Sequence, residues 1–329
     1  MSISRREFAS GLAGATALAT LPRAVRAAAG CPFRLSIIND EISQDFDHAC
    51  SVAANDFGLE WIELRSMWTK NVTDLGGDDI DRARQTLAKY KLRVTDIASP
   101  LFKVHWPGAP VSNRGPRRDP AQIGADFKRQ EDVLNRCIDL CKAFQTDRIR
   151  CFDYWRLDDP KPYRADINDK LRDAAKACAA HHLILLLENE MDCNTGSGKE
   201  AVETLAAVRE PNFMLNWDPG NSATFPGDTP YPDDYHLLPK NRIGHCHCKD
   251  TIRKPDGKFE WAPVGGGTID WVGQFRAFER DGYHYAVSLE THWRGGVPPA
   301  GSGMSVSEAS SRASMKGLKE TLAKAGANC

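Results

Sequence analysis

The sequence predicts a (β/α)8 barrel, and three observations support this fold class. Short runs rich in Val, Ile, Leu and aromatic residues alternate with amphipathic stretches along nearly the whole chain, which is typical of repeated strand–helix units. There are eight strand candidates, the number that closes a parallel barrel. The run Leu183–Leu187 is apolar throughout, as expected for a barrel strand buried on both faces. A doubly wound parallel sheet is the alternative fold.

The expected elements follow one another without an internal repeat or a domain linker. The strand candidates are Phe33–Ile38, Leu59–Leu64, Leu92–Ala98, Arg148–Phe152, Leu183–Glu188, Phe213–Trp217, Ile243–Lys249 and Tyr285–Glu290. The helix candidates are Phe46–Phe57, Ile80–Tyr90, Phe127–Phe144, Ile167–Ala180, Lys199–Val208, Trp271–Arg280 and Ser305–Lys324. The link from Pro219 to Pro239 is only weakly helical. The polar stretch Pro107–Pro120 predicts a long surface loop at the catalytic end, where a lid would lie.

Composition places the chain among soluble globular proteins. Of its 329 residues, 41% are hydrophobic and 26% are charged, and the net charge is −1. There is no global basic field to attract nucleic acid or anionic lipid, so we expect neither as a partner. We expect one barrel domain over residues 30–329. The sequence leaves the oligomeric state open.

The N-terminus predicts an export signal rather than part of the fold. The pair Arg5-Arg6 precedes the apolar run Phe8–Leu21, and the small residues Ala27–Ala29 follow. The run is too short to span a membrane. These features predict a twin-arginine (Tat) signal peptide over residues 1–29, with the Tat translocase as a partner, a periplasmic location and no stable membrane anchor. The alternatives are an Ala-rich helix with a chance Arg pair, and lipidation at Cys31.

Cysteine usage gives no disulfide framework. The chain has 10 Cys, whose spacings differ from those of small disulfide-stapled domains. A Tat substrate folds before export, where thiols stay reduced. We expect most of these residues to be small apolar core residues, and we assign no bridge from the sequence.

Four candidate metal ligands end or follow the last four predicted strands. They are Glu188, Asp218, His247 and Glu290, and successive members lie about one strand–helix unit apart. Because a barrel's active site lies at the C-terminal ends of its strands, all four are expected to converge. Three carboxylates and one imidazole predict a divalent cation, with Mn²⁺ as the first expectation and Mg²⁺, Co²⁺ and Zn²⁺ as alternatives.

Strand alternation refines this choice of ligands. In His245-Cys246-His247-Cys248-Lys249 the two His and the Lys share one face, and the two Cys face the other way, which argues against a zinc knuckle. His247 lies nearer the strand end, so His245 is expected one layer deeper as a hydrogen-bonded core histidine. Lys249 is a candidate substrate contact.

Other polar residues after predicted strands are candidates for the pocket wall. Glu190 shares a face with Glu188 and is expected to support the ligands or contact substrate. Four further candidates, which also suit helix caps, follow the early strands: Glu41, Arg65, His105 and Tyr154. Of these, His105 is retained as a predicted substrate contact.

Taken together, these residues resemble the sugar phosphate isomerase/epimerase, or xylose isomerase-like, barrel superfamily. The matching segments are Leu187–Asn189, Asp218–Asn221, Arg242–Asp250, Pro263–Asp270, Gly282-Tyr283 and Ser288–Glu290. The resemblance covers nearly all of the chain after the signal. It implies metal ligands at the four positions above, catalytic acid/base roles for Glu188 and Glu290, and a carbohydrate as the small-molecule substrate.

The chain departs from the ketose 3-epimerases of this superfamily at two positions, and from the usual Gly-Glu-Gly motif of the superfamily at a third. Arg253 stands where those enzymes have a substrate-contacting Arg, six residues after the metal His. However, Asn221 replaces a His that follows the metal Asp, and Asn194 replaces a Glu. In the glycine-rich Gly265–Gly267, Gly266 replaces another Glu. Arg253 and Asn221 are therefore expected at the substrate, whose identity the departures leave open. The glycines predict either a turn before a helix or a phosphate cradle.

The ligand set suits proton transfer next to a carbonyl. A bound cation stabilises the enediolate charge, and two carboxylates on opposite sides of the substrate can remove and return a proton. This predicts an isomerase or epimerase. The alternatives are a lyase or dehydratase acting on a keto-sugar or cyclic keto-acid, and a non-catalytic sugar-binding barrel. An endonuclease-like reading is disfavoured by the near-neutral charge and the single convincing His ligand.

Overall fold

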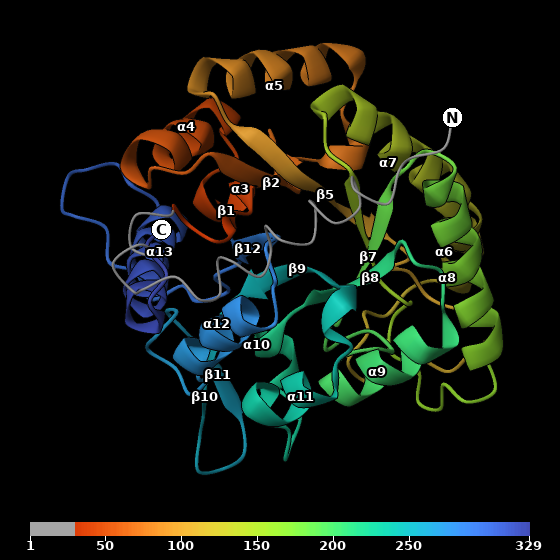
Figure 1. Cartoon of the computed structure of the whole chain (residues 1–329). Coiled ribbons are helices and arrows are strands. Elements are labelled where there is room, and N and C mark those ends of the chain that lie inside the picture. Colours follow the sequence, from red (N-terminus) through yellow and green to blue (C-terminus); the bar gives the residue numbers. More distant parts are fainter. Residues whose placement is uncertain (1–29) are drawn as a thin grey trace, which may run out of the picture.

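The computed structural model describes residues 30–329 and has eight parallel strands in a nearly closed barrel (Figure 1). The predicted signal peptide, residues 1–29, lies outside the described residues. The strands pair in the order β1-β12-β9-β8-β7-β6-β5-β2, and a parallel bridge between Ile38 and Glu63 joins the two edges of this sheet. The barrel prediction is therefore confirmed, and the doubly wound sheet is wrong.

All eight strand predictions correspond to barrel strands, with small shifts at their ends. The strands are β1 (Arg34–Ile37), β2 (Trp61–Leu64), β5 (Arg93–Leu101), β6 (Arg148–Cys151), β7 (Ile184–Glu188), β8 (Phe213–Trp217), β9 (Ile243–Cys248) and β12 (Ala286–Leu289). The largest shift is at β5, which continues to Leu101 instead of ending at Ala98. A register shift between Ile97 and Leu101 accompanies this extension.

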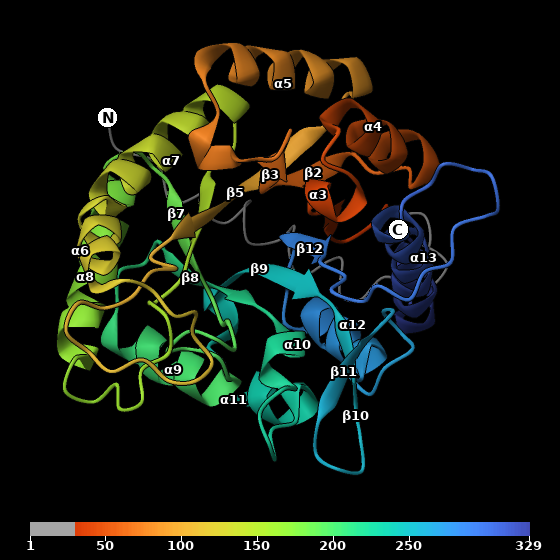
Figure 2. The same ribbon diagram turned by 180° about the vertical axis from the view of Figure 1, so that it is seen from behind.

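Helices surround the barrel on its outside (Figures 1 and 2). The longer ones are α5 (Gly77–Tyr90), α6 (Pro120–Lys128), α7 (Gln130–Phe144), α8 (Arg164–Ala179), α9 (Gly198–Ala207), α12 (Trp271–Arg280) and α13 (Val306–Ala325). The shorter ones are α3 (Asn39–Ile42), α4 (Phe46–Ser51), α10 (Pro219–Ser222) and α11 (Tyr235–Leu237). Among residues 30–329, no helix is both long and apolar enough to cross a bilayer.

The structure differs from the sequence expectations mainly in short elements. The predicted helix over 46–57 is α4 followed by a π-helical turn, Val52–Asp56. Two hairpins were not predicted: β3 (Ser66–Met67) with β4 (Lys70–Asn71), and β10 (Asp250–Arg253) with β11 (Phe259–Ala262). Both lie after barrel strands, so they add to the wall of the mouth.

The barrel strands are buried on both faces, as their apolar sequences predict. Outward-facing side chains such as Cys246 and Cys248 belong to the hydrophobic layer between strands and helices. The inward-facing His245 and His247 alternate with them and are completely buried. The alternation predicted from the sequence is confirmed, and a zinc knuckle is excluded because the thiols and imidazoles face opposite ways.

The described cysteines divide into one disulfide and eight buried thiols. Cys31 and Cys329 are bonded across a sequence separation of 298 residues, so the two ends of the described chain are joined. A lipid on the Cys31 sulfur would exclude this bond. The other eight are free and buried, and burial raises the pKa of Cys137 to about 12. The expectation of mostly apolar core cysteines is confirmed.

We expect Cys31→Ser to lower the free energy of unfolding by about 2–4 kcal/mol, because a cross-link over most of the chain restricts the unfolded ensemble. Urea unfolding of the oxidised wild type and the variant measures this difference. Cys329→Ser and reduced wild type serve as controls and should show the same loss of stability. The double variant Cys31→Ser/Cys329→Ser should lose no more stability than either single variant. A wild type whose stability is unchanged by reduction would contradict the bond.

Candidate metal centre

Four neighbouring strands bring the predicted ligands to one point at the C-terminal end of the barrel. Glu188 ends β7, Asp218 follows β8 as the N-cap of α10, His247 lies in β9, and Glu290 follows β12. One ligand atom from each lies within 4.8 Å of the ligand atoms of the others. Nδ1 of His247 is at the centre, 3.4 Å from Glu188 Oε1, 3.3 Å from Glu290 Oε2 and 3.8 Å from Asp218 Oδ2.

The chemistry of these four side chains fits a divalent cation. All four are buried, with at most 4% of the residue exposed, and three buried carboxylates at one point are unfavourable without positive charge among them. Burial opposes protonation of His247, but Glu63, Glu188 and Glu290 outweigh it and raise the pKa of His247 well above its usual value. The field that favours a proton at this imidazole equally favours a metal ion beside it.

Two basic side chains hold the outer oxygens of two of these carboxylates, that is, the oxygens other than those that face Nδ1 of His247. Arg150 Nη1 lies 3.1 Å from Glu188 Oε2, and Arg65 Nη1 lies 2.8 Å from Glu290 Oε1. Burial raises the pKa of Glu188, but His247 and Arg150 outweigh it and lower the pKa to about 2. Glu188 is therefore ionised at neutral pH, as both a metal ligand and a general base must be.

Lys249 lies inside the cluster rather than beside it. Its ammonium is 2.7 Å from both Asp218 Oδ2 and Glu290 Oε2, and it is almost completely buried. Burial disfavours this charge, but the two carboxylates outweigh it and raise the pKa of Lys249. The aliphatic part of the side chain crosses Gly220 so closely that a Cβ there would lie 2.3 Å from Lys249 Cγ.

Two asparagines fix the orientation of the ligands. Asn189 Oδ1 accepts the backbone N–H of Asp218 at 2.7 Å, and its Nδ2 donates to the carbonyl of Asp218 at 2.8 Å. Asn221 Nδ2 donates to Asp218 Oδ2 at 3.1 Å and lies 3.4 Å from Glu188 Oε1. Asn221, predicted from the sequence, therefore lies in the cluster. Asn189 belongs to the family-matching segment Leu187–Asn189, but no role for it could be predicted, because its position in the sequence does not indicate its hydrogen-bond partners.

Three predicted substrate contacts lie outside the cluster. Glu190 pairs with Lys103 at 2.9 Å. Arg253 donates to the carbonyls of Ala223 and Phe225 and so holds the segment after α10 against β10. His105 Nε2 lies 2.6 Å from the carbonyl of Pro116 and ties the two ends of the predicted lid loop together. The substrate roles of these three residues remain predictions.

Two aromatic side chains that sequence reasoning missed lie at the mouth. Trp261, on β11, has its ring centroid 5.5 Å from Lys249 Nζ. His292 Nε2 is 3.4 Å from Glu290 Oε1, and the His292 ring meets Trp261 edge to face at 4.9 Å. The alternation of aromatic and charged side chains in Phe259-Glu260-Trp261 is the only sequence signal for this strand. The strand is too short for that alternation to predict it.

The glycine-rich loop closes on a carboxylate of the protein itself. Asp250 accepts backbone N–H groups from Gly265 at 3.0 Å and Gly267 at 3.1 Å. A Cβ on Gly267 would lie 2.1 Å from Asp250 Oδ1. The backbone donors that a phosphate would need are thus already used, and the turn interpretation describes this loop.

The fold agrees with the comparisons with known proteins. Residues 52–321 match the family described as "Xylose isomerase-like TIM barrel", so the chain belongs to that family. A protein of Escherichia coli (strain K12) named "Putative L-ribulose-5-phosphate 3-epimerase SgbU" is 25% identical over 172 residues, which are 50% of this chain and 58% of that protein. The match therefore spans less than two thirds of this relative's length.

Solved structures of low sequence identity share the fold. A xylose isomerase-like TIM barrel protein from Mycobacterium smegmatis in complex with magnesium has a TM-score of 0.65 at 16% identity, over 90% of this chain and 98% of that one. The probable 3-DHS dehydratase AsbF from Bacillus anthracis has a TM-score of 0.61 at 21% sequence identity, over 87% of this chain and 98% of that one. For a xylose isomerase-like TIM barrel/4-hydroxyphenylpyruvate dioxygenase fusion protein the TM-score is 0.60 at 16%, over 88% of this chain but 42% of that one.

We expect Gly220→Ala to lower the free energy of unfolding by about 1–3 kcal/mol, because the new methyl group overlaps the Lys249 stem, which is fixed at its far end by two carboxylates. Denaturant unfolding measures the loss. In a Lys249→Ala background the methyl group has room, so the penalty should shrink. Gly124→Ala, where no atom lies within 4 Å, is the control. Equal penalties in the two backgrounds would contradict the close packing.

Proposed function

We propose that this protein is a divalent-metal-dependent isomerase or epimerase that acts on a carbohydrate or keto-sugar through an enediolate. The observation that carries the proposal is the buried cluster of Glu188, Asp218, Glu290 and Nδ1 of His247. Membership of the xylose isomerase-like family and similarity to a protein named as a sugar epimerase support the choice of reaction. Mn²⁺ is our first choice of metal, with Mg²⁺, Co²⁺ and Zn²⁺ as alternatives.

The placement of the two glutamates supports proton transfer on two sides of a substrate. Glu188 comes from β7 and Glu290 follows β12, and β8 and β9 separate these strands. The cation would be held by the four ligands and would polarise the substrate oxygens, which stabilises developing enediolate charge. One glutamate, in its ionised form, then takes the proton next to the carbonyl. The other must have acquired a proton before this step, and it gives that proton to the opposite face and is left ionised.

The surrounding groups keep these glutamates ready for that role. Arg150 on Glu188 and Arg65 on Glu290 each occupy one oxygen and leave the other directed into the cluster. Lys249 provides a third positive charge where an enediolate would lie, since it contacts Asp218 and Glu290 at once. Trp261 and His292 would border the substrate on the same side.

A dehydratase is the second candidate function. If the substrate carries a leaving group on the β-carbon, the electron pair of the enediolate expels it instead of accepting a proton. Arg65 and Lys103 are partly exposed, and although each is paired with protein carboxylates, they are the cations that the carboxylate of a keto-acid would meet. A non-catalytic sugar-binding barrel is the third candidate, and it requires only the cluster and the aromatic border.

We place the protein in the periplasm, after export by the Tat translocase. The support is the sequence pattern of residues 1–29 together with the bond between Cys31 and Cys329, because disulfides persist in oxidising compartments. This bond can form after translocation, since it joins the two ends of an already folded barrel. It would leave Cys31 unavailable for a lipid.

Chelator treatment is expected to abolish turnover, and one divalent ion per chain should restore it, because the ligand carboxylates lie too close together to position substrate without a cation. Mn²⁺, Mg²⁺, Co²⁺ and Zn²⁺ are compared during a screen of ketoses and keto-acids. At 100-fold above its dissociation constant the ion should also stabilise the fold by about 2.7 kcal/mol. Asp218→Asn is the control that should lose this stabilisation. A wild type that binds no metal would refute the proposal.

Glu290→Gln is expected to lower kcat by about 10²–10⁴-fold, because it removes one proton-transfer group. Glu260→Gln is the matched control, since Glu260 is exposed on β11 and pairs with Lys254. Product analysis separates the candidates: an epimer or isomer supports the first, and an unsaturated product absorbing in the ultraviolet supports the second. If the wild type shows no turnover and Glu290→Gln binds the ligand as tightly as the wild type, the third candidate, a non-catalytic sugar-binding barrel, is supported.

A further inference from the structure

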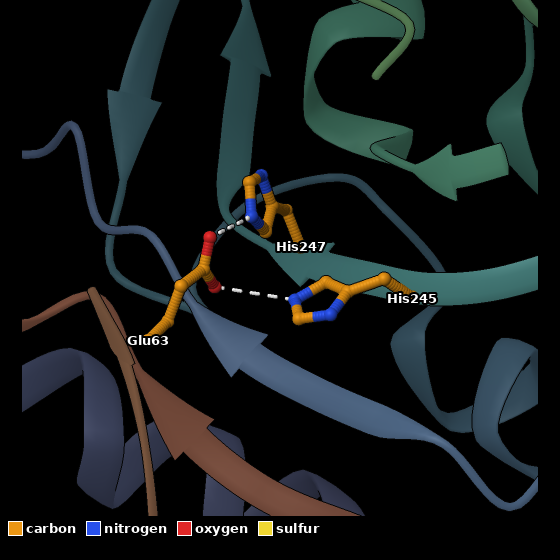
Figure 3. A group of neighbouring side chains, drawn as sticks. All are labelled: Glu63, His245 and His247. Atoms are coloured by element: carbon orange, nitrogen blue, oxygen red, sulfur yellow. Dashed lines mark hydrogen bonds and ion pairs between the residues drawn. The ribbon is translucent and has the colours of Figure 1, made fainter. Parts of the chain in front are cut away.

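A second polar cluster lies one layer deeper in the barrel than the candidate metal centre, and Figure 3 shows two of its members, Glu63 and His245, beside His247. It consists of Glu63 on β2, Asp96 on β5 and His245 on β9, and all three are completely buried. The metal ligand His247 lies above it on the same face of β9. Charged residues are rarely buried at such depth unless they are paired or coordinate a metal.

Glu63 connects the two layers. Its Oε1 lies 3.0 Å from Nε2 of His247, and its Oε2 lies 3.2 Å from Nε2 of His245 (Figure 3). Among the described residues, these two imidazoles are the only hydrogen-bond partners of the Glu63 carboxylate. An ionised carboxylate only accepts hydrogen bonds, so Glu63 selects the form of each imidazole that carries a hydrogen on Nε2. The Asn216 amide nitrogen lies at similar distances from Nε2 and Nδ1 of His247, 3.1 and 3.3 Å, and so does not select between them.

This arrangement decides which nitrogen of His247 can bind a cation. With a hydrogen on Nε2, the free electron pair of a neutral imidazole is on Nδ1. Nδ1 is the atom that faces Glu188, Asp218 and Glu290. We propose that Glu63 is a positioning residue that fixes the tautomer and ring orientation of His247, so that Nδ1 is presented to the metal. This inference rests on the metal centre in the proposed function.

The neighbouring Asp96 has a different relation to the centre. Its Oδ1 is 3.6 Å from Nδ1 of His245, beyond hydrogen-bond distance, and its own hydrogen bond comes from Thr95 at 2.9 Å. Asp96 makes no direct contact with His247. It is therefore a matched control for Glu63: both are buried carboxylates in the same layer, and only Glu63 contacts a metal ligand.

The test compares binding of Mn²⁺ and Co²⁺ to wild type, Glu63→Gln and Asp96→Asn by calorimetry and by the visible spectrum of the Co²⁺ form. Loss of a carboxylate that orients a ligand histidine typically weakens metal affinity about 10–100-fold. We expect that loss and an altered Co²⁺ spectrum for Glu63→Gln, with one ion still bound per chain. Asp96→Asn should match wild type in affinity and spectrum.

Three results would overturn the inference. Equal affinity and spectrum for Glu63→Gln and wild type would show that Glu63 only fills space. Two ions per wild-type chain and one in Glu63→Gln would make Glu63, His245 and His247 a second cation site, since their ligand atoms also lie within 4.8 Å of one another. A wild type that binds no ion would remove the proposed function as well, and this separates the two failures.

A measurement without any variant at Glu63 covers the case in which Glu63→Gln does not fold. Long-range ¹H–¹⁵N spectra of the Mg²⁺-loaded wild type report which ring nitrogen of each histidine carries hydrogen. We expect the Nε2–H form for His247, with its signal assigned by His247→Gln. A hydrogen on Nδ1 of His247 would overturn the inference, whatever the stability of the variants.

Discussion

The site depends on one electrostatic constraint: three carboxylates lie together in the barrel with almost no access to water. Such a group is stable only if positive charge is supplied at the same place. Arg150 and Arg65 supply it on the outer oxygens of Glu188 and Glu290. Lys249 supplies it inside the cluster, on Asp218 Oδ2 and Glu290 Oε2, which also face Nδ1 of His247. The strand order, the close approach at Gly220 and the Glu63 layer all serve this arrangement.

The fold and the convergence of the four candidate ligands could be predicted because both depend on local patterns. Runs such as that of β7 show where strands lie, and a parallel barrel then requires the strand ends to meet. Alternation along β9 correctly separated His247 from the cysteines. These inferences need only the chain direction and the two-residue period of a strand, both of which can be read without knowing any contact.

What was missed depends on contacts between distant segments. Glu63 stands alone in the apolar strand Trp61–Leu64, and its partners are more than 180 residues away in β9. The backbone carbonyls that Arg253 and His105 contact also have positions set by loop conformation, so these contacts could not be predicted, and the substrate roles of both residues stay predictions. The hairpin that carries Trp261 has short strands around an exposed turn, and such turns leave little periodicity to detect.

The bond between Cys31 and Cys329 has a topological consequence for the barrel. It closes residues 31–329 into a covalent ring in which β1 and β12, the first and last strands, are also paired. A single cut in a surface loop would linearise the ring without releasing a fragment. The exposed segment around Val297 would therefore tolerate new chain ends in a circular permutant, with every barrel strand still next to its present neighbours.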